Sequence, residues 1–200
     1  YRRQRQMCIR DSVYAILPDK GGNLLLGTLS ALVSFNPEKK SFTTIDKEKD
    51  GTPFTSQRIT ILFRDSHKRL WVGGEEGISV FQQEGIEIEK VPILPESSVT
   101  KTFTNCIYEA ANGIIWVGTR EGFYCFNEKE KKIKRYTTAN GLPNNVVYGI
   151  LEDTFGRLWV STNRGISCFN PETERFRNFT ESDGLQSCLL YTSDAADDKA

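Results

Sequence analysis

One short block of residues recurs four times along this 200-residue chain and constrains every fold that the chain can adopt. The copies occupy positions 22–28, 68–73, 112–119 and 156–162. Successive copies are 46, 45 and 43 positions apart, measured between their central residues Leu25, Trp71, Trp116 and Trp159. A nearly constant period of this length is the signature of a repeat architecture, in which one supersecondary unit packs against copies of itself.

Each period contains four segments with the composition of β-strands. In the last period an apolar run (149–152) precedes the block, a glycine-bounded alternation (165–169) follows it, and a short segment (176–180) closes the repeat. The segments are short, β-branched and aromatic, and Gly, Asn, Asp or Pro separates them. No window carries a helical stripe of apolar residues. Four antiparallel strands in roughly 40–45 residues form one propeller blade, so the sequence predicts an all-β fold, a β-propeller fragment of about four blades.

The repeats predict the domain organisation. We expect one four-stranded antiparallel blade in each of the spans 13–46, 58–92, 103–138 and 146–181. Residues 1–12 and 187–200 match no repeat column and have the character of translated adapter sequence, so both are predicted to be non-native tails. The chain would then be an internal piece of a longer gene product, and the remaining blades of that product would be partners of this segment.

The central column of the repeat predicts a structural role. Its tryptophans lie in the middle of a strand, between Leu or Ile on one side and Val on the other. That environment is typical of packing between neighbouring blades, with the indole N–H bonded to a polar partner. We therefore expect Leu25, Trp71, Trp116 and Trp159 to be core residues and not an exposed platform for a sugar.

Charge and motifs argue against several classes of function. The 26 basic and 26 acidic residues balance, which favours neither nucleic acid nor an anionic membrane as a partner. No apolar run reaches the roughly 20 residues of a membrane span. His67 is the single histidine, and the calcium-like start at 46–51 has Gln57 where a bidentate Glu is needed. We expect no catalytic residue, no metal and no cofactor in this segment.

Strand alternation places the connections of a blade on two opposite faces. The turns between the second and third strands and the links between blades share one face, and these loops are polar. The residues predicted to contact a ligand there are Glu75, Glu76, Arg120, Glu121, Asn140, Asn144, Asn145, Asn163 and Arg164. Planar Asn, Arg and carboxylate groups can form paired hydrogen bonds with sugar hydroxyls. Asn and Gly also favour turns for conformational reasons alone, so a purely structural role stays open for each of these residues.

The last repeat resembles a known family. Residues 150–176, followed by the Asp-Gly-Leu at 183–185, closely resemble the two-component regulator propeller repeat, and 140–145 repeats its closing element. The resemblance covers about 13–186 and is weakest in the first repeat, where Leu25 replaces Trp. The resemblance implies that this segment belongs to the periplasmic sensor region of an inner-membrane hybrid histidine kinase and detects a small molecule or oligosaccharide. It also implies a second receptor copy as a further partner and no direct contact between this segment and the membrane.

Two other functions remain open. Streptogramin-lyase-type propellers have a similar repeat pattern, but their chemistry should require more acid–base residues than one His. A protein-interaction propeller should present an apolar loop face, whereas the loops named above are polar.

Overall fold

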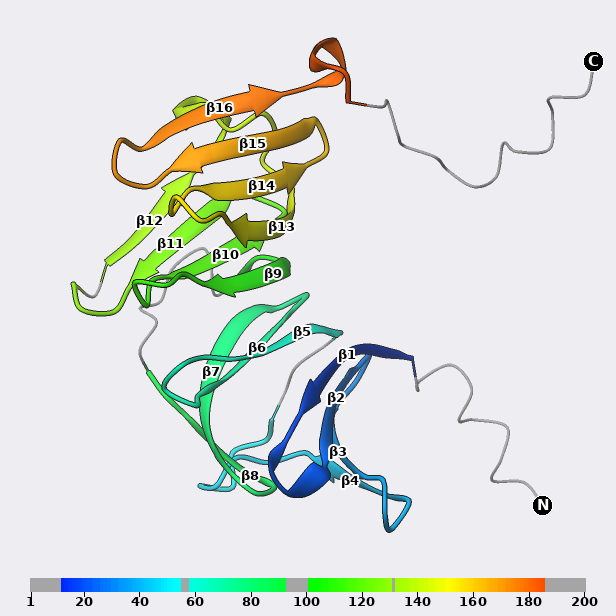
Figure 1. The fold of residues 1–200 in the computed structure, drawn as a ribbon. Coiled ribbons are helices and arrows are strands. Elements are labelled where there is room, and N and C mark those ends of the chain that lie inside the picture. Colours follow the sequence, from blue (N-terminus) through cyan, green and yellow to red (C-terminus); the bar gives the residue numbers. More distant parts are fainter. Residues whose placement is uncertain (1–11, 55–57, 93–100, 131, 186–200) are drawn as a thin grey trace, which may run out of the picture.

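The computed structural model describes residues 12–54, 58–92, 101–130 and 132–185, which form four four-stranded antiparallel sheets (Figure 1). The strands of the first two sheets are β1 (Val13–Pro18), β2 (Leu24–Thr28), β3 (Leu32–Asn36), β4 (Ser41–Ile45), β5 (Ile59–Arg64), β6 (Leu70–Gly74), β7 (Gly77–Glu84) and β8 (Glu87–Lys90). Those of the last two are β9 (Thr104–Glu109), β10 (Ile115–Thr119), β11 (Phe123–Asn127), β12 (Lys132–Tyr136), β13 (Val147–Glu152), β14 (Leu158–Thr162), β15 (Gly165–Asn170) and β16 (Arg175–Phe179). The predicted all-β fold is confirmed.

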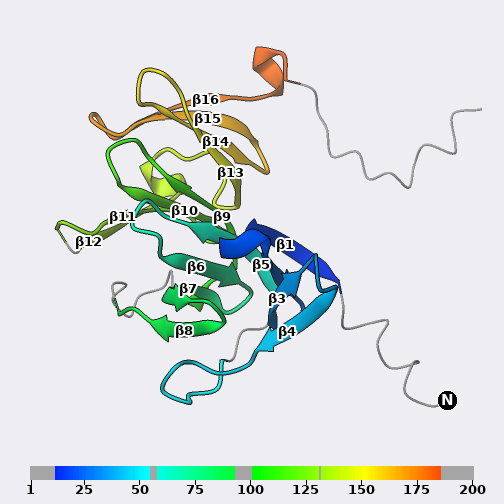
Figure 2. The same ribbon diagram turned by 60° about the horizontal axis from the view of Figure 1, so that its bottom comes forward.

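Each sheet is one blade, and its strands are paired in chain order. The four sheets fall one in each predicted blade span. The predicted tails lie outside the described residues, apart from Ser12. Both views show the blades side by side in a fan, with β1, β5, β9 and β13 on the inside and the fourth strands on the outside (Figures 1 and 2).

The apolar core lies between the blades. Alternation along each strand sends neighbouring side chains to opposite faces of the sheet, so Trp71 packs with the third blade while Val72 packs with the first. The interface between the last two blades is the most aromatic, with the Trp116 ring stacked 4.8 Å from Phe123 and edge-on to Phe169 at 5.6 Å. Burial of these faces is what joins one repeat to the next.

A column of glycines allows the blades to approach closely. Gly27, Gly73 and Gly118 occupy the same position in successive second strands. A Cβ atom at Gly118 would lie 2.5 Å from Val147 Cγ1 on the next blade, far inside van der Waals contact. The fourth blade has Ser161 at this position, and its outer face contacts no further blade in the described chain.

Inner strands are also linked by side chains that emerge at a β-bulge. The first strand of every blade has a register shift near its start. In the second blade Thr60 Oγ1 donates to the Thr104 carbonyl at 3.1 Å, and in the third Asn105 Nδ2 donates to the Val147 carbonyl at 2.8 Å. In these two blades the bulge therefore directs a polar side chain to the next inner strand.

The first and last blades differ from the two inner ones because no described blade packs against one of their two faces. Leu25, Trp71 and Trp116 are buried at 0%, 0% and 2% exposure, but Trp159 is half-buried and stacks on Phe179 at 5.6 Å. Within the described ranges, no helix has the length and apolar character that a membrane crossing requires.

Candidate ligand-binding face

Two faces of the blade array carry the connections. We call the closing face the one formed by the turns after β2, β6, β10 and β14 and by the links that follow β4, β8, β12 and β16. The turns after the first and third strands form the opposite face. All nine residues predicted to contact a ligand lie on the closing face, because the strand order within every blade is the expected one.

A threonine holds three of the turns on the closing face in shape. Thr119 Oγ1 donates to the Gly122 carbonyl at 2.9 Å and accepts from the Glu121 N–H at 3.0 Å. Thr28 and Thr162 make equivalent bonds in the first and fourth blades. Such side-chain bonds fix a turn by replacing backbone partners. The residues at the tips of these three turns are therefore displayed on a rigid support.

The charged residues at the turn tips are exposed. Glu75 and Glu76 lie at the tip of the β6–β7 turn. In the third blade the Arg120 guanidinium lies 4.0 Å from the centre of the Phe103 ring, and Arg135 Nε donates to the Glu121 carbonyl at 3.1 Å. These contacts stay within one blade. The structure thus aligns the predicted charged residues on one face without joining those of different blades.

The predicted asparagines of the link after β12 support the backbone. Asn140 Oδ1 accepts from the Thr137 N–H at 3.0 Å, and Asn145 Oδ1 accepts from the Thr138 N–H at 2.9 Å. Asn144 Oδ1 accepts from a backbone N–H two residues further on, at 2.8 Å. This geometry favours the structural alternative for the three side-chain oxygens. Asn163 and Arg164 instead stand exposed at the β14–β15 turn.

One predicted residue borders a cavity. Glu76 lines a space of about 310 Å³ between the second blade and the link that follows β4. Glu48 from that link and Lys90 at the end of β8 also line it. Sequence analysis did not select these two residues, because nothing in the repeat pattern shows that the link folds back onto β8.

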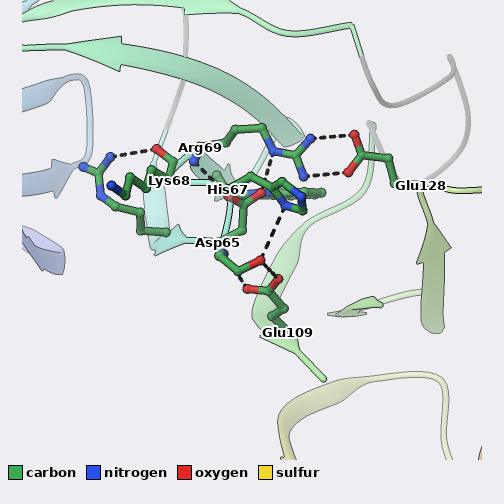
Figure 3. A network of polar contacts seen from close by, with 9 residues as sticks. Asp65, His67, Lys68, Arg69, Glu109 and Glu128 are labelled. Carbon is green, nitrogen blue, oxygen red and sulfur yellow. Dashed lines mark hydrogen bonds and ion pairs between the residues drawn. The ribbon is translucent and has the colours of Figure 1, made fainter. Parts of the chain in front are cut away.

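The opposite face carries a buried charge network (Figure 3). The Asp65 carboxylate accepts from Arg69 N–H at 2.8 Å, from Arg69 Nε at 2.7 Å and from Trp71 Nε1 at 2.8 Å. Arg69 then reaches the third blade through a bidentate pair with Glu128 at 2.7 and 2.8 Å. Glu109 of the third blade accepts from Ser66 N–H at 2.7 Å in the second. Asp65 thus supplies the indole partner that the sequence predicted for Trp71 without identifying it.

Electrostatics in the network agree with a structural role. The hydrogen bonds with Glu128 raise the pKa of Arg69, and those with Arg69 lower the pKa of Glu128. Both groups therefore stay ionised, and their bonding atoms are committed to each other. His67 is exposed nearby, 3.5 Å from Ser66 Oγ.

The fourth blade repeats this arrangement and the third does not. Asp153 accepts from Arg157 Nε at 2.8 Å and from Trp159 Nε1 at 3.0 Å. Burial alone would raise the pKa of Asp153, but the bonds from Trp159, Arg157 and the Phe155 N–H together lower it to about 2. In the third blade the aspartate is replaced by alanine, and the buried Trp116 Nε1 has no hydrogen-bond partner among the described residues.

Comparisons with known proteins agree on the repeat. The two-component regulator propeller family matches residues 97–121 and 141–164. A protein named histidine kinase P4, from Formosa agariphila, is 30% identical over 159 residues, which cover 76% of this chain and 12% of that protein. The chain therefore spans only a small part of this relative.

Solved structures share the fold at lower identity. The extracellular domain of a proposed one-component system from B. thetaiotaomicron has a TM-score of 0.68 at 22% identity, over 86% of this chain and 22% of that one. The extracellular domain of a proposed hybrid two-component system from the same organism has a TM-score of 0.59 at 22% identity, over 87% and 29%. Virginiamycin B lyase from Staphylococcus aureus has a TM-score of 0.58 at 18% identity, over 84% and 55%.

Proposed function

Because the chain carries two-component regulator propeller repeats, we propose that it is a ligand-sensing segment of a bacterial receptor and that its ligand is a carbohydrate. The observation that carries the proposal is the contrast between the two faces. On the opposite face Arg69 and Glu128 are paired with each other between two blades, whereas Glu75, Glu76 and Arg164 stand exposed on turns of the closing face. Loops of this kind on a rigid scaffold are where binding residues concentrate.

The remaining parts of the proposal concern the larger receptor. We place the segment in the periplasm, as the sensor part of an inner-membrane hybrid histidine kinase, with further blades of the same chain and a second receptor copy as partners. Support comes from the similarity to a histidine kinase and from two receptor extracellular domains with the same fold. We also propose that the segment is not itself an enzyme. The likeness to a lyase is one of fold. The Glu109 carboxylate beside Ser66 is bonded to the Ser66 N–H and hydroxyl.

Titration calorimetry of the 200-residue chain against neutral and anionic oligosaccharides tests the carbohydrate ligand. We expect at least one oligosaccharide to bind with a dissociation constant in the micromolar to millimolar range and to raise the urea midpoint of the chain, because a ligand that binds only the folded state stabilises it. If no oligosaccharide binds at concentrations of about 10 mM, which correspond to a binding free energy of roughly −3 kcal/mol, the carbohydrate part of the proposal is refuted.

A further inference from the structure

We propose that the cavity between the first blade's closing link and the second blade binds one uncharged sugar ring. This inference rests on the proposed function and assigns a site and a ligand class to it. The cavity is about 310 Å³, at the lower end of the roughly 300–1,000 Å³ that small-molecule sites occupy. It therefore suits a single ring better than an extended oligosaccharide.

The wall of the cavity is the link after β4, which folds back as a docked loop. Lys47 and Pro53 pair across it, and the Phe54 N–H donates to the Asp46 carbonyl at 2.9 Å. The Lys49 N–H donates to the Ile88 carbonyl at 2.8 Å, which fastens the loop to the outer strand of the second blade. The loop thus bridges the wedge where the first two blades diverge, and the cavity remains beneath it.

The floor of the cavity combines one partly exposed aromatic ring with polar groups. Register pairs Val72 with Ser79 and Phe81 with Lys90, so these four side chains lie on the same side of the second sheet. Phe54 from the loop meets the Phe81 ring edge-on at 5.5 Å. Because Val72 and Phe81 are almost fully buried, the half-buried Phe54 ring is the surface open to the C–H face of a pyranose, and the Ser79 hydroxyl lines the same space.

The rim of the cavity supplies hydrogen-bonding groups. Glu48 and Glu76 approach from the loop and from the β6–β7 turn, and Lys90 comes from the end of β8. Glu48 Oε2 accepts from the Lys90 N–H at 3.3 Å, which orients that carboxylate. Carboxylates accept strongly from hydroxyl groups, and an ammonium donates to hydroxyl oxygens. One partly exposed aromatic ring among polar groups matches a sugar ring that has C–H faces and equatorial hydroxyls.

Charge around the cavity selects against acidic sugars. A shallower depression of about 480 Å³ adjoins it, sharing Glu48 and Lys90 and adding Lys49, Asp50 and Glu89. Together with Glu76, the two spaces are bordered by four carboxylates and two ammonium groups. This negative surplus repels a uronate or a sulfated sugar and leaves an uncharged one unaffected. The depression also gives the rest of an oligosaccharide a path out of the cavity.

The test compares two adjacent glutamates of the same turn. Calorimetric titrations would use the intact chain and neutral trisaccharides of glucose, mannose, galactose and xylose, with a trigalacturonate as the acidic probe. E76Q should weaken binding of the best neutral probe about five- to tenfold, because a hydrogen bond to a charged group is lost. E75Q is the matched control and should bind like the wild type, because Glu75 does not line the cavity. Near-UV circular dichroism establishes that both variants remain folded.

Different failures are distinguishable. If a neutral probe binds and E76Q and E48Q leave its affinity unchanged, the cavity is not the site, although the proposed function stands. If trigalacturonate binds more tightly than every neutral probe, the charge argument is overturned. If no probe binds, both the carbohydrate part of the proposed function and the site are refuted. Support for the inference requires neutral binding that E76Q weakens and E75Q does not.

Discussion

Replacing Asp65 with alanine tests whether this buried carboxylate stabilises the second blade and the Arg69 side chain that reaches the third. The Asp65 side chain is fully buried and accepts three hydrogen bonds, from Arg69 N–H, Arg69 Nε and Trp71 Nε1. The substitution leaves these donors without a partner. Removing one member of a buried charge pair generally costs about 3–5 kcal/mol.

Two features of the structure act on the expected loss in opposite directions, and the first places it near the lower end of that range. Glu128 keeps its bidentate pair with Arg69, so the guanidinium retains one carboxylate. Asp65 also accepts from the Trp71 indole, a neutral donor whose lost bond costs about 1–3 kcal/mol when it stays buried. We therefore expect D65A to lower the free energy of unfolding by about 3 kcal/mol.

Urea denaturation followed by tryptophan fluorescence measures this loss, since Trp71 borders the change. The matched control is E38A, which removes an exposed carboxylate from a turn of the first blade. Its effect should stay within about 0.5 kcal/mol. A loss below about 1 kcal/mol for D65A would refute the view that the bonds accepted by Asp65 stabilise the fold.

Three further predictions concern the blade interfaces. W116A should lower the free energy of unfolding by about 3–5 kcal/mol in urea denaturation, because the ring is packed among Phe123 and Phe169; a small loss would indicate an exposed ring. G118A should lower the free energy of unfolding by about 1–3 kcal/mol, because the added methyl group overpacks against the next blade. S161A, at the same position of the fourth blade, should be nearly neutral, and equal effects of the two variants would contradict the view that glycine is needed for close approach of the blades. The pKa of Asp153 is about 2 when folded and roughly 3.9 in an unfolded chain, so its stabilisation is present above about pH 4 and is lost as the pH falls towards 2. The urea midpoint should accordingly fall more between pH 5 and pH 2 in the wild type than in D153N, and identical pH profiles would exclude this contribution.

Much of the candidate site depended on how side chains meet, which the sequence pattern shows only in part. The closing face was predictable, because strand alternation alone decides on which side Glu76 and Arg164 emerge. Whether an asparagine on that face is free was not predictable: Asn140, Asn144 and Asn145 each turn their oxygen to a nearby backbone N–H. The cavity could not be anticipated either, because it depends on a link docking against the outer strand of the next blade.

The sequence by itself determined the blade. Local composition sets the strands, glycine and asparagine set the turns, and alternation around the Trp column sets which side chains of a strand share one face of the sheet, since all of these follow from short-range patterns. Tertiary structure decided how the blades are joined. Asp65 and Glu128 are 63 positions apart and meet only through Arg69. Trp116 is buried because the fourth blade packs on its face of the sheet, whereas Trp159 is half-buried because no described blade packs on its face. Burial and charge pairing between repeats depend on contacts distant in the chain, which a local pattern does not specify.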